Sequence, residues 1–384
     1  MIDAAAARLT AALSAPAPLV SRSFVDSVLL HAHQALPPLL LGLLLTAILV
    51  PVSSLVARRV GALAPPGGHH IHSKMIPSLG GLALYAGFLG AVLVFADRDR
   101  TTLGLLITSG LAAVIFAGDD VRPFAARWKL AAQVGLALLA IWAFGFQIGF
   151  LTLPHFGLQQ LGLLALPISL FWLVGVQNTV NLLDGIDGLA AGVVGIVAIA
   201  LMLAAANKGQ TQVLMEAAAL TGCCAGFLVF NFHPARIFMG DGGSHFLGIA
   251  VGLIAIAGVA KVTVVLALAV PVLALSLPIL DTGWAVIRRR RGGLGIAQAD
   301  TKHIHHQMLG FGLSQRETCL LFYLSTAIFS GIGLMLFGHR HIIAVVIILF
   351  VVALSTVVGE KLKASCVTIG WPHRWPLSSS GRSR

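Results

Sequence analysis

Four polar side chains recur every three residues in the segment NTVNLLDGIDGLAAG, which begins at residue 178. They are Asn178, Asn181, Asp184 and Asp187. On an ideal helix each step of three residues lags by about 60°, so Asn178 and Asp187 would lie on opposite sides. They can face one site only if the helix tightens or breaks, which the neighbouring glycines permit. A helix cap would explain one aspartate but not all four residues. The segment therefore predicts a broken helix end, of the kind that membrane proteins tolerate where it lines a wet cavity.

A second candidate element is FMGDGGSHFLG, from Phe238 to Gly248, in which Asp241 directly precedes two glycines and a new apolar run. This arrangement is typical of an N-terminal helix cap. It is equally suited to presenting a carboxylate and bare amides to a metal–phosphate group. The local sequence favours neither interpretation over the other.

A third element, GDDVRPFAARWKLAAQ, carries adjacent carboxylates at Asp119 and Asp120. Adjacent side chains diverge on a helix, which allows one of them to serve chemistry and the other structure. Lys129 follows about two and a half helical turns later, at the mouth of the next apolar stretch.

The fourth element is a basic, histidine-rich loop from Arg288 to Met308. Its candidate ligands are Asp300, His303, His305 and His306. A zinc site is one interpretation, but His303 and His305 would diverge by about 200° on a helix. A nucleotide pyrophosphate, which needs donors and positive charge, is the interpretation that we favour.

Several carboxylates brought to one pocket would repel one another, at about 4 kcal/mol per pair at 4 Å and an effective dielectric near 20. Either some of them carry protons, or a hard divalent cation lies among them. Oxygen ligands beside a phosphate substrate favour Mg²⁺, with Mn²⁺ as a substitute. The pattern predicts phosphoryl transfer from a soluble nucleotide donor to a lipid acceptor.

The composition tells which elements must position these residues. Of 384 residues, 58% are hydrophobic and only 10% are charged, with a mean hydropathy of +0.94, which excludes a soluble globular protein. The formal net charge of +11 indicates cytoplasmic loops and anionic partners in a lipid bilayer rather than nucleic acid. The four cysteines have no metal or disulfide spacing, so we interpret them as small apolar residues.

Charge-free stretches predict an all-α polytopic membrane protein with about eleven transmembrane helices. The predicted spans are 36–57, 75–96, 101–118, two within 130–183 with a turn near 154–160, 188–207, 217–235, 242–260, 262–280, 318–339 and 341–359. Residues 1–35 are expected to form a tail or surface helix without a cleavable signal peptide, and residues 360–384 a basic, disordered tail.

Assigning Lys and Arg to alternate loops places 18 on one face and 7 on the other. The positive-inside rule makes the first face cytoplasmic. The aspartates of all four elements fall on this face. We therefore expect an active site that opens to the cytoplasm.

The ordered motifs GDD…KL, NxxNxxDGxDGLA, NxxPAxxFMGDxGSxxLG and DxxHxHH resemble the polyprenyl-phosphate N-acetylhexosamine-1-phosphate transferases, which start the synthesis of bacterial cell-envelope glycans. The resemblance extends over about residues 36–359. The HIHH run is similar to the WecA/TagO-like branch rather than to the related muramoyl-pentapeptide branch (MraY). It implies UDP-N-acetylglucosamine, or another UDP-N-acetylhexosamine, as donor and undecaprenyl phosphate as acceptor, with UMP released. The resemblance further implies the plasma (inner) membrane of a bacterium as the location, and a homodimer is among the expected assemblies.

The resemblance also implies a role for each matching residue. Asp241 corresponds to the magnesium ligand, and Asp119, with Asp120 as its partner, to the carboxylate that deprotonates or positions the lipid phosphate. Lys129 corresponds to a lysine near the phosphates. The nucleotide and metal segment, together with the donor-binding histidine motif, supplies the remaining candidates: Asn178, Asn181, Asp184, Asp187, Asp300, His303, His305 and His306.

Two places depart from the family pattern. In the first cytoplasmic loop, from Ala64 to Pro77, His72 fits as a substrate-binding residue, but Ala64 replaces an aspartate and His69-His70 an Arg-Lys pair. Histidine is largely neutral at pH 7, so this loop should attract phosphate less strongly. His245, inside the GDxGS motif, is also unusual. A secondary transporter and an inactive family member that acts as a scaffold remain as alternatives.

Overall fold

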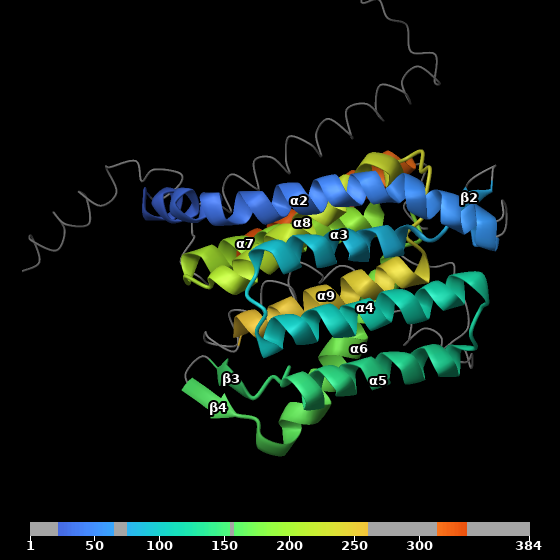
Figure 1. Cartoon of the computed structure of the whole chain (residues 1–384). Coiled ribbons are helices and arrows are strands. Elements are labelled where there is room, and N and C mark those ends of the chain that lie inside the picture. Colours follow the sequence, from blue (N-terminus) through green and yellow to red (C-terminus); the bar gives the residue numbers. More distant parts are fainter. Residues whose placement is uncertain (1–21, 65–74, 154–156, 260–312, 336–384) are drawn as a thin grey trace, which may run out of the picture.

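The computed structural model describes residues 22–64, 75–153, 157–259 and 313–335, which form a bundle of helices lying side by side (Figure 1). Helices α2 (Arg22–Val60), α3 (Gly80–Phe95), α7 (Leu189–Asn207) and α8 (Thr211–Asn231) lie on one side of α9 (Gly240–Val259), while α4 (Arg100–Val121), α5 (Ala126–Phe144) and α6 (Ala165–Leu183) complete the other. Helix α13 (Gln315–Met335) packs against α7. The predicted all-α architecture is confirmed.

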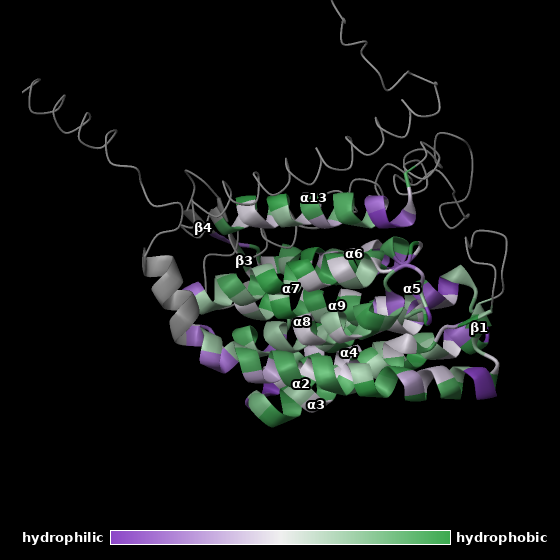
Figure 2. Cartoon of the chain, turned by 90° about the horizontal axis from the view of Figure 1, so that it is seen from above, coloured by the Kyte–Doolittle hydropathy of each residue, from purple (hydrophilic) through white to green (hydrophobic). Residues whose placement is uncertain are grey.

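Within the described residues, eight helices are long and apolar enough to cross a membrane. Helix α3 has only 16 residues but is among the most apolar. Figure 2 shows apolar residues along the helices and hydrophilic ones gathered toward their ends. The predicted spans 262–280 and 341–359, residues 1–21 of the N-terminal segment and the C-terminal tail at 360–384 lie outside the described residues. The total of eleven spans therefore stays a prediction.

Helix α2 differs from the sequence expectation at its start. It is continuous over 39 residues from Arg22, with three prolines inside it, so no element boundary falls at residue 36. The sequence boundary marked the first long apolar run, but a helix satisfies its own backbone hydrogen bonds whether its side chains are polar or apolar. Neighbouring helices also allow prolines within membrane helices.

The connection between α5 and α6 is longer than the predicted turn. It begins at Gly145, in the left-handed region with φ 79°, and contains the antiparallel hairpin β3 (Phe150–Leu153) and β4 (Gly157–Gln160). The short helix η1 (Gly162–Leu164) then leads into α6. A second pair of short strands, β1 (Leu63–Ala64) and β2 (Ile76–Pro77), closes the base of the loop between α2 and α3.

Close backbone approach fixes the start of α9 in the middle of the bundle. A Cβ added to Gly81 at the start of α3 would collide with the backbone of Gly242 and Gly243. Gly81 donates its amide hydrogen to the carbonyl of Met239 at 2.9 Å. Helices α3 and α4 both pack against α9. The GDGGS segment is thereby placed beside the end of α4, which carries Asp119 and Asp120.

Candidate active site

The polar repeat that begins at Asn178 breaks the helix where the sequence predicted it. Helix α6 ends at Leu183, Asp184 occupies its C-cap position, and Gly188 takes a left-handed conformation with φ 82° before α7 begins. The Gly188 amide donates to Asn231 Oδ1 at 3.0 Å, and its carbonyl accepts the Tyr323 hydroxyl at 2.6 Å. The break is therefore held from two other helices and separates the roles of the four polar residues.

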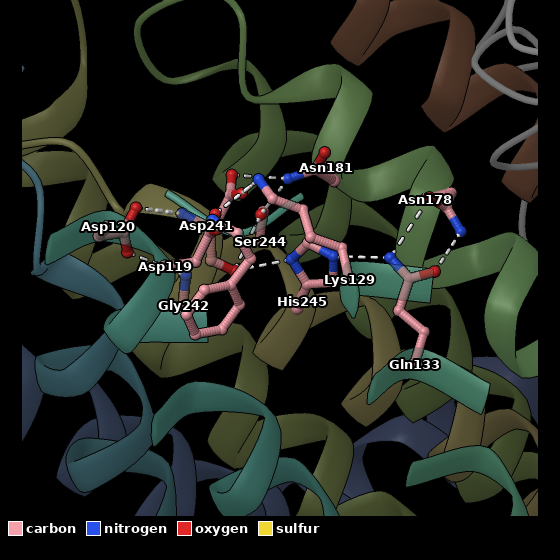
Figure 3. Close-up of polar contacts among 11 residues, drawn as sticks. Asp119, Asp120, Lys129, Gln133, Asn178, Asn181, Asp241, Gly242, Ser244 and His245 are labelled. Carbon is pink, nitrogen blue, oxygen red and sulfur yellow. Dashed lines mark hydrogen bonds and ion pairs between the residues drawn. The ribbon is translucent and has the colours of Figure 1, made fainter. Parts of the chain in front are cut away.

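Asp241, in the first turn of α9, lies at the centre of the site (Figure 3). Its Oδ2 is 2.5 Å from Lys129 Nζ, and its Oδ1 accepts a hydrogen bond from Asn181 Nδ2 at 3.0 Å. Lys129 Nζ is also 2.5 Å from Asp119 Oδ2. Asn181 Nδ2 donates further to Ser244 Oγ at 3.0 Å. Helices α4, α5, α6 and α9 thus bring four predicted site residues together.

The two adjacent aspartates of α4 have different tasks, as their divergence allowed. The Asp120 carboxylate accepts the amide hydrogens of Asp241 at 2.8 Å and Gly242 at 3.1 Å, and so caps the N-terminus of α9 from another helix. Asp119 Oδ1 accepts the amide hydrogen of Phe124 at 2.5 Å, while its other oxygen meets Lys129. Because Asp120 supplies the cap, the Asp241 side chain is left to contact Lys129 and Asn181.

Lys129 changes the electrostatic argument made from the sequence. The sequence alone predicts that protons or a divalent cation hold the carboxylates together. The structure shows a third solution, since the Lys129 ammonium lies between Asp119 and Asp241. Asp119 is buried, with 5% of its side chain exposed, whereas Lys129 is 31% exposed. A charge-assisted contact of this kind offsets the repulsion between the two carboxylates without any ion from solution.

A cavity of about 960 Å³ opens beside Asp241, near the upper end of the range for small-molecule sites. Four carboxylates line it: Asp120, Asp184, Asp187 and Asp241. Arg58 and Arg236 line it as well and add positive charge. Burial, followed by the charges of Asp241, Asp120 and Asp187, raises the pKa of Asp184 well above its ordinary value. The cavity thus combines an acidic wall with arginines suited to phosphate.

Asp187 lines this cavity but also holds its rim. Its Oδ2 accepts the Ala235 amide hydrogen at 3.0 Å and lies 2.8 Å from His233 Nδ1. Arg316 of α13 donates to the His233 carbonyl at 3.0 and 3.1 Å. The segment between α8 and α9 is therefore fastened to the helix break on one side and to α13 on the other.

Asn178 neither lines the cavity nor contacts Asp241, unlike the other described candidates, which do one or the other or, in the case of Asp119, reach Asp241 through Lys129. Asn178 lies one turn before Asn181, and the Nδ2 of Asn178 donates to Gln133 Oε1 at 2.8 Å. Gln133 in turn reaches His245 Nε2 at 2.8 Å, and the His245 ring stacks on Phe116. The unusual histidine thus has a structural partner on each side. Because the helix breaks only after Leu183, Asn178 stays on the regular part of α6 and points into the bundle.

Sequence reasoning missed several residues of the site. Gln133 lies four residues after Lys129, so its place on the same helix face could have identified it. Ser244 belongs to a motif that had been singled out, but without a role. Arg58 and Arg236 were assigned only to a face of the membrane, and no local pattern marks them as cavity residues. His72, Asp300, His303, His305 and His306 lie outside the described residues and remain predictions.

The described side chains form no group of three or more His, Cys, Asp or Glu residues that could hold a metal ion. Mg²⁺, however, is usually held by one or two carboxylates, with substrate phosphates and water completing its shell. Asp184 and Asp241 offer such oxygen ligands on one cavity wall. The donor set therefore fits a magnesium ion that binds together with a phosphate substrate.

Residues 102–259 match the family described as glycosyl transferase family 4. A probable undecaprenyl-phosphate N-acetylglucosaminyl 1-phosphate transferase of Bacillus subtilis is 34% identical over 326 residues, which cover 84% of this chain and 90% of that protein. A decaprenyl-phosphate N-acetylglucosaminephosphotransferase of Mycolicibacterium smegmatis is 33% identical over 74% of this chain and 76% of its own. A phospho-N-acetylmuramoyl-pentapeptide-transferase of Moorella thermoacetica is 38% identical over 58% of this chain and 75% of its own. These similarities do not favour a transporter.

Proposed function

Because the chain belongs to the polyprenyl-phosphate N-acetylhexosamine-1-phosphate transferases of glycosyl transferase family 4, we propose that it transfers N-acetylglucosamine 1-phosphate from its UDP-sugar to undecaprenyl phosphate. The observation that carries the proposal is the meeting of Lys129 with Asp119 and Asp241 beside a cavity lined by arginines and carboxylates. A phosphoryl transfer needs such positioning and charge stabilisation more than covalent help from the protein.

Two observations support N-acetylglucosamine as the sugar. The Bacillus subtilis relative named for this sugar is similar over 84% of the chain, whereas relatives named for the muramoyl pentapeptide are similar over 58% and 76% of it. The HIHH motif supports the same branch. The name of the Bacillus relative also supports undecaprenyl phosphate as acceptor.

In the proposed reaction an oxygen of the lipid phosphate attacks the donor phosphorus that is bonded to the sugar. The bond from that phosphorus to the bridging oxygen breaks, and UMP leaves with this oxygen. The products are UMP and a sugar linked to the lipid through a diphosphate. The lipid phosphate carries about −1.5 charges at pH 7, so it needs little deprotonation before it attacks.

The residues of the chain act mainly by positioning and by charge. Lys129, held between Asp119 and Asp241, presents positive charge where the phosphates react. Arg58 and Arg236 bind donor phosphates at the cavity wall. Asp119 acts through Lys129, because it contacts Lys129 but is buried and does not line the cavity.

Asp241 and Asp184 would hold a magnesium ion, with Asn181 orienting the Asp241 carboxylate. The ion, when bound, would neutralise the charge of the diphosphate and of the departing UMP. Burial raises the pKa of Asp184, and a bound ion favours its deprotonated form, so we expect ion binding to lower that pKa.

We further propose that the cavity faces the cytoplasm of a bacterial plasma membrane. Positive residues gather at the cavity end of the described helices: Arg58, Arg59, Arg122, Arg127, Lys129, Arg236 and Arg316. The opposite end holds fewer of them: Arg22, Arg98, Arg100 and Lys208. The positive-inside rule supports this orientation, and UDP-sugars are cytoplasmic donors.

The test measures UMP release by the full chain in lipid nanodiscs with undecaprenyl phosphate. UDP-N-acetylglucosamine, UDP-N-acetylgalactosamine and UDP-N-acetylmuramoyl pentapeptide are compared, each with Mg²⁺ and with a chelator. We expect UMP and lipid-linked sugar in equal amounts from UDP-N-acetylglucosamine with Mg²⁺. No UMP from any donor would overturn the proposed activity and favour an inactive scaffold, and release only from the pentapeptide donor would overturn the choice of sugar.

A further inference from the structure

A second polar layer lies about one helical turn further into the bundle than Lys129, Asn181 and Asp241 and consists of Gln133, Asn178 and His245 (Figure 3). His245 and Gln133 are 1% and 3% exposed, and Asn178 is partly buried. Gln133 Nε2 lies 2.8 Å from His245 Nε2 and 3.3 Å from Asn178 Oδ1. Buried polar groups within the membrane need hydrogen-bond partners, and these three side chains supply partners to one another from three different helices.

The residues of this layer come from the same three helices as Lys129, Asn181 and Asp241. Gln133 lies four residues after Lys129 on α5, and His245 lies four residues after Asp241 on α9. Asn178 lies three residues before Asn181 on α6. Residues three or four apart occupy the same face of a helix. The Lys129–Asp241–Asn181 cluster and the Gln133–His245–Asn178 layer are therefore stacked along the same three helices.

The direction of every hydrogen bond in this layer is fixed. His245 Nδ1 is 2.8 Å from the Asp241 carbonyl, which can only accept, so Nδ1 carries the proton. His245 Nε2 must then accept from the Gln133 amide nitrogen, which turns Gln133 Oε1 toward the Asn178 amide. The ring lies on Phe116 with centroids 3.6 Å apart and planes 9° from parallel. A fully satisfied network of this kind specifies one arrangement of its helices.

We propose that Gln133, Asn178 and His245 are positioning residues, which hold α5, α6 and α9 in the register at which Lys129 and Asn181 meet Asp241. Lipid tails are as apolar as leucine side chains, so apolar contacts alone would select this register weakly. The layer lies behind the cavity rather than in it, so it acts through Lys129, Asn181 and Asp241 and not on substrate.

The kinetic part of the test rests on the proposed function. Gln133→Leu removes the central amide, and His245→Phe keeps a ring on Phe116 but loses both hydrogen bonds. We expect kcat to fall about 10- to 100-fold, as for other groups that orient a reacting centre, while KM changes far less. The matched control is Thr179→Val on α6, because Thr179 is equally buried but donates to the carbonyl of Gly175 on its own helix.

Two further variants separate positioning from simple destabilisation. His245→Asn retains a donor for the Asp241 carbonyl, so it should recover part of the rate that His245→Phe loses. In a Lys129→Met background, Gln133→Leu should lower kcat much less than in the wild type, because the residue that it positions has gone. An equal loss of kcat in both backgrounds would overturn the proposal.

A readout without substrate keeps the two proposals distinct. Amine acylation followed by mass spectrometry reports how freely Lys129 leaves its two carboxylates. Gln133→Leu and His245→Phe should raise the acylation rate of Lys129 severalfold, whereas Thr179→Val should leave it unchanged. Unchanged Lys129 acylation in both layer variants would overturn the positioning role. A wild-type chain that releases no UMP would overturn the proposed function, while these rates would still decide the role of the layer.

Discussion

Replacing Lys129 with methionine tests whether its ammonium is the internal counter-ion of the site. The substitution keeps an unbranched apolar stem and removes the charge, which leaves Asp119 and Asp241 facing each other. Breaking a buried ion pair by removing one partner costs about 3–5 kcal/mol. Lys129 is about one-third exposed, so solvent reduces this cost, and we expect roughly 2 kcal/mol of lost unfolding free energy.

The second variant, Lys129→Met with Asp119→Asn, removes one of the two carboxylate charges that the first leaves unpaired. The double variant should therefore recover much of the stability lost in Lys129→Met, although it lacks both the Lys129 ammonium and the Asp119 carboxylate. Both are compared by thermal unfolding in the same detergent at pH 7.5. The control is Arg127→Met on the same helix, where the arginine lies over Trp128 at 5.6 Å and is exposed.

UMP release is the second measurement for the Lys129 variants. Both Lys129 variants should lose most UMP release, since neither offers positive charge beside Asp241. The reasoning is refuted if Lys129→Met is as stable as the wild type. It is also refuted if adding Asp119→Asn lowers stability further instead of restoring it, because the repulsion between the two carboxylates would then be absent.

Four further outcomes are expected. Asp120→Ala should lower the unfolding free energy by about 1–2 kcal/mol through loss of the α9 cap, measured by thermal unfolding, while Asp120→Asn should lower it less. Mn²⁺ binding, followed by electron paramagnetic resonance with UDP-N-acetylglucosamine present, should weaken strongly in Asp241→Asn. The raised pKa of Asp184 favours its protonated form in the folded chain. The stability that Asp184 contributes is therefore fully present below the ordinary carboxyl pKa and is lost as pH rises through the pKa of Asp184 in the folded chain. Without metal, Asp184→Asn should accordingly be more stable than the wild type at pH 8 but not at pH 3. A cysteine at Gly185 should react with a membrane-impermeant thiol reagent only from the cytoplasmic side and one at Arg98 only from the other, and labelling of Gly185→Cys from both sides would restore the transporter alternative.

Much of the site could be predicted because its residues carry a local pattern. The break after Leu183 follows from polar residues every three positions with glycines between them, since no regular helix serves all four. The different roles of Asp119 and Asp120 follow from their adjacency on a helix. The spans follow from the length of apolar stretches, which the bilayer fixes.

The rest depends on which helices become neighbours, and a single sequence does not state that. Asp120 caps α9, more than a hundred residues away along the chain, so the role of Asp241 could not be separated from that of a cap beforehand. Lys129 could be placed near the phosphates only by resemblance, and its position between two carboxylates became visible once α4, α5 and α9 were packed. Asn178 was predicted to be a site residue because it lies three residues before Asn181 in the polar repeat. Its hydrogen-bond partner, Gln133, lies on another helix, so the sequence alone did not show this contact.

The long first helix has a consequence outside the catalytic end. A helix of 39 residues measures about 58 Å, whereas the hydrocarbon layer is about 30 Å thick and the whole bilayer about 45 Å. Since α2 ends beside the cavity at Val60, we expect its excess length to extend beyond the bilayer at its other end. We expect the N-terminal turns of α2 to form a rigid helical extension on the side of the membrane opposite the cavity. A rigid marker for electron microscopy could be fused to this extension, because it lies far from the active site.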